Sequence, residues 1–217
     1  MPHRNSAGIV KIVPVASEKF ELEGYKTRGI RLAGRATVAD RDTHPRLSPP
    51  EVLAKLRAVY PEGVQTGGNS SGLTDGAAAA LVANGAVKAE WGHPALGRIA
   101  ATAVVGVPPE TMGIGPAPAI QLLLQCAGLT LDDITLVEVN EAQGAQTLAV
   151  QRALGLDGAK LNVNGGAIAL GHPLAASGVR LTITASRELQ RRGGRWAVAS
   201  ACIGGGQGIA VLLENPA

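Results

Sequence analysis

Apolar and polar positions in the second half of the chain follow the periods of strands and helices in turn. Four short apolar runs predict strands: 97–107, 134–139, 195–201 and 208–213. Three longer segments have helical spacing: 116–127, 141–154 and 173–192. A further short strand is expected at 160–163, before a glycine-rich loop at 164–167. Strands that alternate with helices predict an α/β fold, a mixed sheet with covering helices in an α/β/α layered arrangement.

The helix predicted at 173–192 has the clearest pattern in the chain. Its apolar face would consist of residues spaced three or four apart: Leu174, Gly178, Leu181, Ala185 and Leu189. Gly193 and Gly194 follow directly, and glycine at this place ends a helix.

The first 66 residues are more polar and less regular. An apolar run at 10–15 predicts an edge strand, because Pro14 cannot donate a ladder hydrogen bond. Ser48 as a cap, with proline in the first turn, predicts a helix that continues to Tyr60. Residues 71–83 would supply a buried helical turn and an apolar run, and another short helix is expected to end at Trp91.

Composition narrows the cellular setting and the class of partner. Hydrophobic residues make up 46% of the chain but aromatic residues only 2%, so the core must be aliphatic. Two cysteines form no disulfide framework, and the first residues lack a secretory signal, so we expect a cytoplasmic protein. No run approaches the ~20 apolar residues that a membrane span needs. The net charge of +3 gives no case for nucleic acid as a partner.

Three polar side chains stand where predicted elements begin or end. Asn140 follows one strand, and Cys202 ends another just before three successive glycines, 204–206. His172 lies between the glycine-rich loop and the long helix. Ligands of α/β sheets usually bind at such strand ends. Asparagine can orient a water or donate a hydrogen bond, histidine and cysteine can move protons, and glycine N–H groups can approach an oxyanion. Together these groups predict carbonyl chemistry.

Each of these residues also has a structural interpretation. A lone cysteine at a strand end is more often a small buried hydrophobic residue, and asparagine and glycine are common in turns. Only the joint pattern therefore favours a site. The other cysteine, Cys126, lies in a predicted packing helix and is expected to be a buried thiol.

Several dispersed segments resemble the signatures of one enzyme family. Residues 162–173, NVNGGAIALGHP, with Ala176-Ser177-Gly178 after them, and residues 202–208, CIGGGQG, are similar to two thiolase signatures. Shorter matches are NEA at 140–142, MGIGP at 112–116, GNSSG at 68–72 and DTHPR at 42–46. They occur in one order from about residue 9 onward, so the chain resembles the C-terminal half of the two-domain thiolase fold.

The resemblance implies a role for four residues. His172 would activate the nucleophilic cysteine, and the same imidazole with Asn140 and a water would stabilise the enolate oxygen of a thioester. Cys202 would be the base that takes the α-proton of acetyl-CoA. Gly204, two positions later, would supply an N–H to the oxyanion hole. Removal of a weakly acidic α-proton needs a nearby base and fixed donors on the enolate, which agrees with these assignments.

The resemblance also implies the substrates and the residues that would contact them. The reaction is acyl transfer between acyl-CoA and acetyl-CoA, or the reverse thiolysis, with coenzyme A thioesters as substrates and no cofactor or metal. The candidate substrate-binding residues are Ser71, Gly72, Leu73 and Met112, with Ser71 on the pantetheine arm and Met112 in the acyl pocket. A homo- or hetero-oligomer is expected.

The resemblance divides the chain into three parts. Residues 1–66 would be a remnant of the thiolase loop domain, residues 67–95 the end of the N-terminal half, and residues 96–217 the C-terminal domain. No segment matches the part of the N-terminal half that carries the acyl-accepting cysteine. Gln143 and Ala175 replace an aromatic residue and a glycine of the family pattern, and would reshape the acyl pocket or loosen the backbone.

Three functional interpretations follow from these matches. In the first, the chain acts with a separate N-terminal thiolase half. In the second, it is a truncated, non-catalytic binding or assembly module. In the third, GNSSG is the nucleophile elbow of a serine hydrolase, with Ser70 as nucleophile and Asp132 or Asp133 and His172 as partners. A poor, glycine-broken strand before Ser70 argues against the third.

Overall fold

A four-stranded mixed sheet forms the centre of the computed structural model, which describes residues 15–16, 38–39, 42 and 44–216. The strand order is β3-β6-β5-β4; β4 and β5 run parallel, and the other two neighbouring pairs run antiparallel. The strands are β3 (Arg98–Gly106), β4 (Ile134–Val139), β5 (Trp196–Ile203) and β6 (Gln207–Glu214). Two further short strands, β1 (Val15–Ala16) and β2 (Val38–Ala39), pair with each other.

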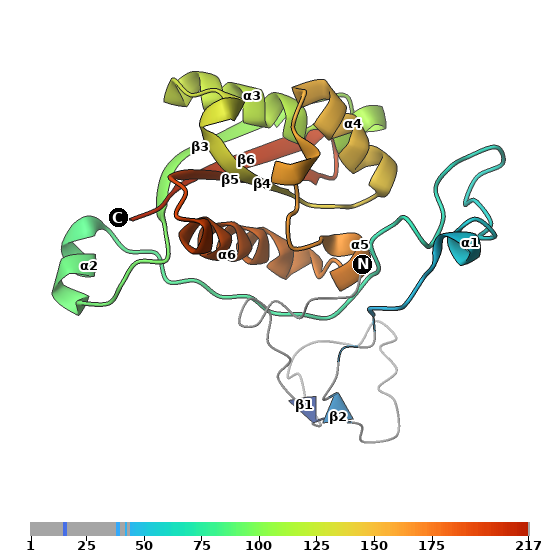
Figure 1. Cartoon of the computed structure of the whole chain (residues 1–217), viewed down its shortest axis with the longest axis horizontal. Coiled ribbons are helices and arrows are strands. Elements are labelled where there is room, and N and C mark those ends of the chain that lie inside the picture. The colour runs from blue at the N-terminus through green and yellow to red at the C-terminus, as the bar shows by residue number, and fades with distance from the viewer. Residues whose placement is uncertain (1–14, 17–37, 40–41, 43, 217) are drawn as a thin grey trace, which may run out of the picture.

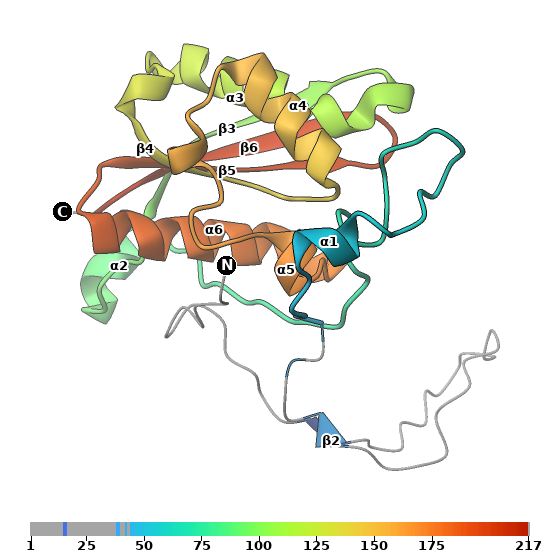
Figure 2. The ribbon, with the colours of Figure 1, turned by 45° about the vertical axis from the view of Figure 1, so that its right-hand side comes forward.

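Helices cover both faces of this sheet. Figures 1 and 2 show α3 (Pro116–Ala127) and α4 (Gly144–Leu154) on one face, and α6 (Leu174–Arg192) with the short α5 (Ala167–Leu170) on the other. The described residues also contain the short 3-10 segments η1 (Pro109–Ile114), η2 (Leu131–Asp133) and η3 (Gly158–Lys160). The α/β/α layered arrangement predicted from the sequence is therefore confirmed.

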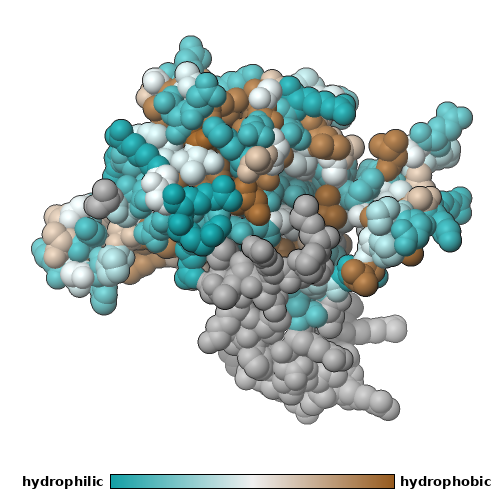
Figure 3. All heavy atoms as spheres, in the orientation of Figure 1, coloured by the Kyte–Doolittle hydropathy of each residue, from teal (hydrophilic) through white to brown (hydrophobic). Residues whose placement is uncertain are grey.

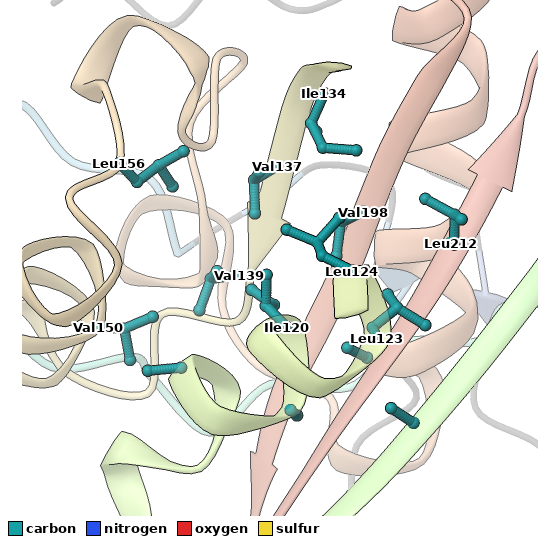
Figure 4. Packing of buried hydrophobic residues seen from close by; sticks show 14 residues of the cluster. Ile120, Leu123, Leu124, Ile134, Val137, Val139, Val150, Leu156, Val198 and Leu212 are labelled. Atoms are coloured by element: carbon teal, nitrogen blue, oxygen red, sulfur yellow. The ribbon is translucent and has the colours of Figure 1, made fainter. Parts of the chain in front are cut away.

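The core lies in two layers because strand side chains alternate between the faces. Val137, Val198 and Leu212 point toward α3 and α4, and Figure 4 shows them packed with Ile120 and Leu123 of α3. Their sequence neighbours on the opposite face pack against α6: Leu136, Ala197, Ala199 and Leu213. Each fully buried Leu or Ile side chain contributes about 1.5–3 kcal/mol to folding, so aliphatic residues suffice for this core.

The long helix α6 confirms part of its predicted apolar face. Leu181, Ala185 and Leu189 are buried against the sheet, and Gly193 ends the helix with a positive φ of 63°. The first turn was predicted wrongly, because Leu174 is 73% exposed and Gly178 is exposed as well. This turn lies beside the His172 loop and buries Ala176 and Ser177 instead.

Most predicted elements of the second half are confirmed within a few residues, but two are not. Residues 160–163 form no strand, because η3 ends at Lys160 and only Leu161 makes a bridge, to Val137. The loop expected at 164–167 leads directly into α5, which the sequence pattern did not predict. Four residues are too few for helical periodicity to be read.

The first half differs more from its prediction. The helix expected from Ser48 to Tyr60 is only α1 (Pro50–Leu53), with Pro49 at the N-cap and no side-chain cap. None of its residues is buried, and a helix without a packed face does not propagate far. Residues 71–83 contain no helix, whereas the short helix before Gly92 is present as α2 (Gly85–Trp91). The strand predicted at 10–15 falls outside the described residues except for Val15 of β1.

Residues 69–97, named the strap here, run along the molecule beside α6 (Figures 1 and 2). At one end Ser71 N donates to Ala142 O over 3.0 Å, and His172 N donates to Gly72 O over 2.9 Å. At the other end Gln190 Nε2 donates to Ala95 O over 3.1 Å. The strap therefore spans α6 from its beginning to its end.

The glycine turn between β5 and β6 gives a stability prediction. Gly206 has a φ of 93°, and a Cβ there would collide with the carbonyl oxygen of Val107, whose N–H donates to Gly206 O. Gly206→Ala should therefore lower the free energy of unfolding by about 2–4 kcal/mol. Gly204→Ala is the matched control: a Cβ there meets no atom within 4 Å, so a change within about 0.5 kcal/mol is expected. Equal midpoints for the two variants in urea unfolding would contradict this account.

Candidate active site

The ends of the two parallel strands bring the predicted site residues to one edge of the sheet. Asn140 follows β4, and its N–H donates to Ser200 O of β5 over 2.9 Å. Cys202 lies two residues further along β5. Because parallel neighbours end at the same edge, Asn140 and Cys202 are placed together there, where ligands of such sheets usually bind.

His172 meets Asn140 through their side chains. The Asn140 Nδ2 and His172 Nε2 atoms are 3.3 Å apart, and the other ring nitrogen, Nδ1, lies 2.6 Å from Ser177 Oγ. Asn140 is buried and His172 is half-buried. Burial, with the positive charge of Arg180, lowers the pKa of His172 below its ordinary value. The imidazole is therefore mostly neutral at neutral pH and has the protonation state of a base.

Cys202 lies near the end of β5, the strand that pairs with β4. Ala201 packs with the α6 cluster, so by alternation the Cys202 side chain leaves β5 on the α3 side. Among the described residues, no hydrogen bond joins its thiol to Asn140 or His172. Burial raises the pKa of the Cys202 thiol above its ordinary value, so the protonated form dominates near neutral pH.

The turn after Cys202 presents free backbone. Gly205 and Gly206 both have positive φ, 88° and 93°, which only glycine adopts without strain. Gly204 is exposed, and in the part of the chain that is described its N–H takes part in no backbone hydrogen bond. A backbone N–H without a hydrogen-bond partner at an exposed position beside a strand end can donate to an oxyanion.

Of the four predicted substrate-binding residues, three are in the strap. Ser71 and Gly72 are half-buried and hydrogen-bonded to the loops of Asn140 and His172, whereas Leu73 is 89% exposed. Met112 is half-buried in η1, and the next residue, Gly113, lies against Gln146 of α4. The structure therefore places Ser71 and Gly72 beside the His172–Asn140 pair and turns Leu73 outward. Their roles toward a substrate stay predictions.

Two polar residues that the sequence reasoning did not single out hold the end of β4. Asn162 has a positive φ of 45°, and its side chain accepts from Val139 N over 2.8 Å and donates to Val139 O over 2.9 Å. Its Nδ2 also donates to Glu141 Oε1 over 2.8 Å, while Glu141 Oε2 accepts from Ile168 N over 3.2 Å. Asn162 and Glu141 thus tie together the loops that carry Asn140 and His172. Both lie in segments that match the family motifs, 140–142 and 162–173, and this match is the sequence feature that could have identified them.

A buried ion pair lies on the α6 face of β4. Arg180 Nη1 is 4.0 Å from Glu138 Oε2, and the Glu138 side chain is fully buried. Burial raises the pKa of Glu138 to about 8, and the charge of Arg180 opposes this shift. The charge of Arg180 is also what helps to lower the pKa of His172. The positive charge of Arg180 therefore contributes to keeping the imidazole neutral.

Two sequence predictions do not agree with the structure. Cys126 is exposed on α3, not a buried thiol, because it lies on the side of the helix opposite Ile120, Leu123 and Leu124. The serine hydrolase triad is also not assembled. Asp132 and Asp133 precede β4, whereas His172 contacts Asn140 at its far end. Six strand residues separate these ends, a distance of about 20 Å, and Ser70 Oγ donates to Thr66 O instead.

No cluster of three metal-binding side chains was found in the described part of the chain. None of its helices is long and apolar enough to cross a membrane.

Comparison with known proteins places this chain in one family. The family model described as "Thiolase, C-terminal domain" matches residues 93–215. A β-ketoadipyl-CoA thiolase of Acinetobacter baylyi is 52% identical over 186 residues, 84% of this chain and 46% of the relative. The crystal structure of human mitochondrial 3-ketoacyl-CoA thiolase in complex with CoA aligns with a TM-score of 0.76 and 47% identity, covering 82% of this chain and 46% of that one. A Bacillus anthracis acetyl-CoA acetyltransferase aligns with a TM-score of 0.79 and 39% identity, covering 94% of this chain and 49% of that one.

The fold and site define a class of protein: an α/β/α domain with an asparagine and a cysteine at the ends of neighbouring parallel strands and a histidine in the loop between two helices. The family model matches more than half of the chain, and the chain belongs to the thiolase family, in its C-terminal portion. It spans about half the length of the curated relatives it matches. The family resemblance predicted from the sequence motifs is thereby confirmed. The division into residues 1–66, 67–95 and 96–217 stays a prediction.

Proposed function

We propose that this chain supplies the proton-transfer half of a thiolase-type acyltransferase site, and that a complementary N-terminal half supplies the acyl-accepting cysteine. The observation that carries the proposal is the 3.3 Å approach of Asn140 Nδ2 to His172 Nε2 at the end of β4. Both nitrogens lie at the edge of the sheet where β5, with Cys202 next to its last residue, also ends. A thioester oxygen at this place would receive two hydrogen bonds when its enolate forms.

The first half of the reaction uses His172 as base and Cys202 as acid. His172 Nε2 takes the thiol proton of the partner's cysteine, and the thiolate attacks the ketone carbon of a 3-ketoacyl-CoA. The bond between the α- and β-carbons breaks, and its electron pair leaves as the enolate of acetyl-CoA. Asn140 and the protonated His172 donate to the enolate oxygen, and the Cys202 thiol protonates the α-carbon.

The second half of the reaction returns His172 and Cys202 to the protonation states in which they began. The Cys202 thiolate takes the proton of an incoming coenzyme A thiol, whose sulfur attacks the acyl-cysteine. Gly204 N–H donates to the tetrahedral oxyanion of this step. The acyl group leaves as acyl-CoA, and the released cysteine thiolate takes back the proton from His172. No cofactor or metal takes part. A neutral His172 and a protonated Cys202, the forms that their lowered and raised pKa values favour, match this cycle at its start.

The surface of the chain supports the need for a complementary half. Eleven of the seventeen exposed large hydrophobic side chains among the described residues fall between Leu47 and Leu96, and no described residue before Ala103 is buried. Leu73, Leu81 and Val82 of the strap are 75–89% exposed. Figure 3 shows hydrophobic residues, in brown, on the surface of the segment that projects around α1. Exposed apolar side chains in this number along one stretch of the chain support an interaction surface there.

The substrate class follows from the relatives and is part of the proposal. Their names specify β-ketoadipyl-CoA and 3-ketoacyl-CoA thiolases, and one solved relative is a complex with CoA. We infer that this chain acts on 3-ketoacyl-CoA thioesters and coenzyme A, and that it works as an oligomer with its complementary half. The cytoplasmic location expected from the cysteine content stays a prediction, since a relative is mitochondrial.

Reconstitution tests the proposal. The chain is mixed with a separately produced N-terminal thiolase half that carries the nucleophilic cysteine, and cleavage of acetoacetyl-CoA by coenzyme A is followed. Turnover is expected in the mixture. Co-elution of the two halves without turnover would favour the alternative, a non-catalytic assembly module, and would overturn the proposed function.

A further inference from the structure

Ser177 is buried beside His172 and contacts the ring nitrogen that faces away from Asn140. Its side chain is only 3% exposed, in the first turn of α6, and its Oγ lies 2.6 Å from His172 Nδ1. The same oxygen lies 3.0 Å from the carbonyl oxygen of Pro173, one turn earlier in the chain. Ser177 thus stands between an imidazole nitrogen and a carbonyl oxygen.

The direction of these hydrogen bonds is determined by the single hydroxyl proton. A carbonyl oxygen only accepts, so an approach of 3.0 Å between Ser177 Oγ and Pro173 O needs the Ser177 proton between them. Ser177 Oγ then has only lone pairs left for the imidazole. His172 Nδ1 must therefore carry the proton in this contact, and the neutral ring has its free lone pair on Nε2.

The contact on the other side of the ring agrees with this assignment. Asn140 Nδ2 donates, and it lies 3.3 Å from His172 Nε2, which must accept. Donors and acceptors alternate without conflict from the Asn140 amide through the imidazole and Ser177 to the Pro173 carbonyl. In the opposite tautomer, with the proton on Nε2, the Ser177 hydroxyl would have to donate to Nδ1. Ser177 Oγ and Pro173 O would then lie 3.0 Å apart with no proton between them. The Asn140 side-chain amide would also have to be rotated so that its oxygen accepts from Nε2.

We propose that Ser177 is a positioning residue that holds neutral His172 in the Nδ1–H tautomer, so that Nε2 faces the Asn140 side of the site as the base. The backbone supports the same placement, because His172 N donates to Gly72 O over 2.9 Å and this bond ties the His172 loop to the strap. The value of this tautomer in catalysis rests on the proposed function, because only an unprotonated Nε2 can take the thiol proton. The tautomer itself does not depend on that function.

Nuclear magnetic resonance of the chain alone tests the tautomer. In a sample labelled with ¹⁵N-histidine, at a pH where the imidazole is neutral, couplings from the ring nitrogens to the ring C–H protons show which nitrogen bears the proton. The signals of His172 are identified by their loss in His172→Gln. The wild-type chain should show the Nδ1–H form. An Nε2–H form in the wild-type chain would overturn the proposal.

Substitution of Ser177 tests its cause. Ser177→Ala removes the acceptor for Nδ1–H, so the population should shift toward the Nε2–H form, whereas Ser177→Thr, which keeps the hydroxyl, should restore Nδ1–H. Ser186→Ala removes another buried hydroxyl of α6, beside Gly97, and should leave the tautomer unchanged. Retention of Nδ1–H in a folded Ser177→Ala chain would contradict the proposal. If that variant does not fold, the wild-type spectrum decides.

Kinetics of the reconstituted enzyme separate this inference from the function it rests on. Ser177→Ala should lower kcat roughly tenfold with little change in KM, a smaller loss than that of a charged partner in a catalytic triad. A silent wild-type mixture would overturn the proposed function and leave the spectroscopic result standing. An unchanged kcat in Ser177→Ala would overturn the positioning role while the proposed function stands.

Discussion

His172→Ala should reduce thiolysis of acetoacetyl-CoA by the reconstituted enzyme about 10³-fold, which corresponds to about 4 kcal/mol of transition-state stabilisation. The imidazole is assigned two tasks, as the base for the nucleophilic thiol and as a donor to the enolate oxygen. Both depend on Nε2, the nitrogen that faces Asn140. The initial rate of acetoacetyl-CoA loss, measured at matched concentrations of both halves, checks this prediction.

A matched histidine gives the control for that loss. His93 is exposed, and His93→Ala should keep the wild-type rate. Circular dichroism of His172→Ala establishes that the sheet is intact, since His172 also contacts Ser177. A folded His172→Ala enzyme with more than a tenth of the wild-type rate would show that the imidazole is not the base.

Cys202→Ala should affect two chemical steps to different degrees: proton transfer at the α-carbon and transfer of the acetyl group. Proton transfer at the α-carbon should fall by about 10²–10⁴-fold, the range that general acid–base groups contribute. Transfer of an acetyl group from acetyl-CoA to the partner's cysteine needs no α-proton. Cys202 there only protonates the departing coenzyme A thiolate, which is a stable anion, so this rate should fall less, by about tenfold. Exchange of solvent deuterium into the methyl group of acetyl-CoA reports the first step, and covalent labelling of the partner half with radioactive acetyl reports the second.

The second cysteine of the chain provides the control for this experiment. Cys126 is exposed on α3, and Cys126→Ala should leave both measurements unchanged. Equal loss of deuterium exchange and acetyl labelling in Cys202→Ala would contradict an account in which transfer of the α-proton depends most strongly on Cys202. It would indicate that the substitution disturbs the whole strand end.

The central sheet and its helices could be predicted because the apolar residues of these segments recur with the spacing typical of strands and helices. The bounds predicted for α3 and β4 agree with the structure, since α3 begins at proline and ends before Gly128, and β4 is a short apolar run. Parallel pairing of β4 with β5 then brings Asn140 and Cys202 to the same edge. The residue motifs identified His172 as the third member, and its contact with Asn140 confirms that the two side chains meet.

What the sequence did not predict depends on tertiary contacts. Ser177 and Asn162 look like ordinary helix and loop residues until their hydrogen bonds to His172 and Val139 are seen. Helical signals after Ser48 were misleading, because propensity and capping cannot extend a helix that has no face to pack. Cys126 was misassigned because the phase of a helix toward the sheet, rather than its hydrophobicity, determines which of its residues are buried.

The most direct test of the central claim is the cleavage of acetoacetyl-CoA by coenzyme A in one continuous assay, first with this chain alone and then after the N-terminal half is added. No cleavage above the background rate is expected until the N-terminal half is added. After this addition, the rate should rise and saturate when the two halves are equimolar. Cleavage by the chain alone, or none after a complex has been verified by co-elution, would contradict the claim that residues 1–217 carry the proton-transfer groups but not the acyl-accepting cysteine.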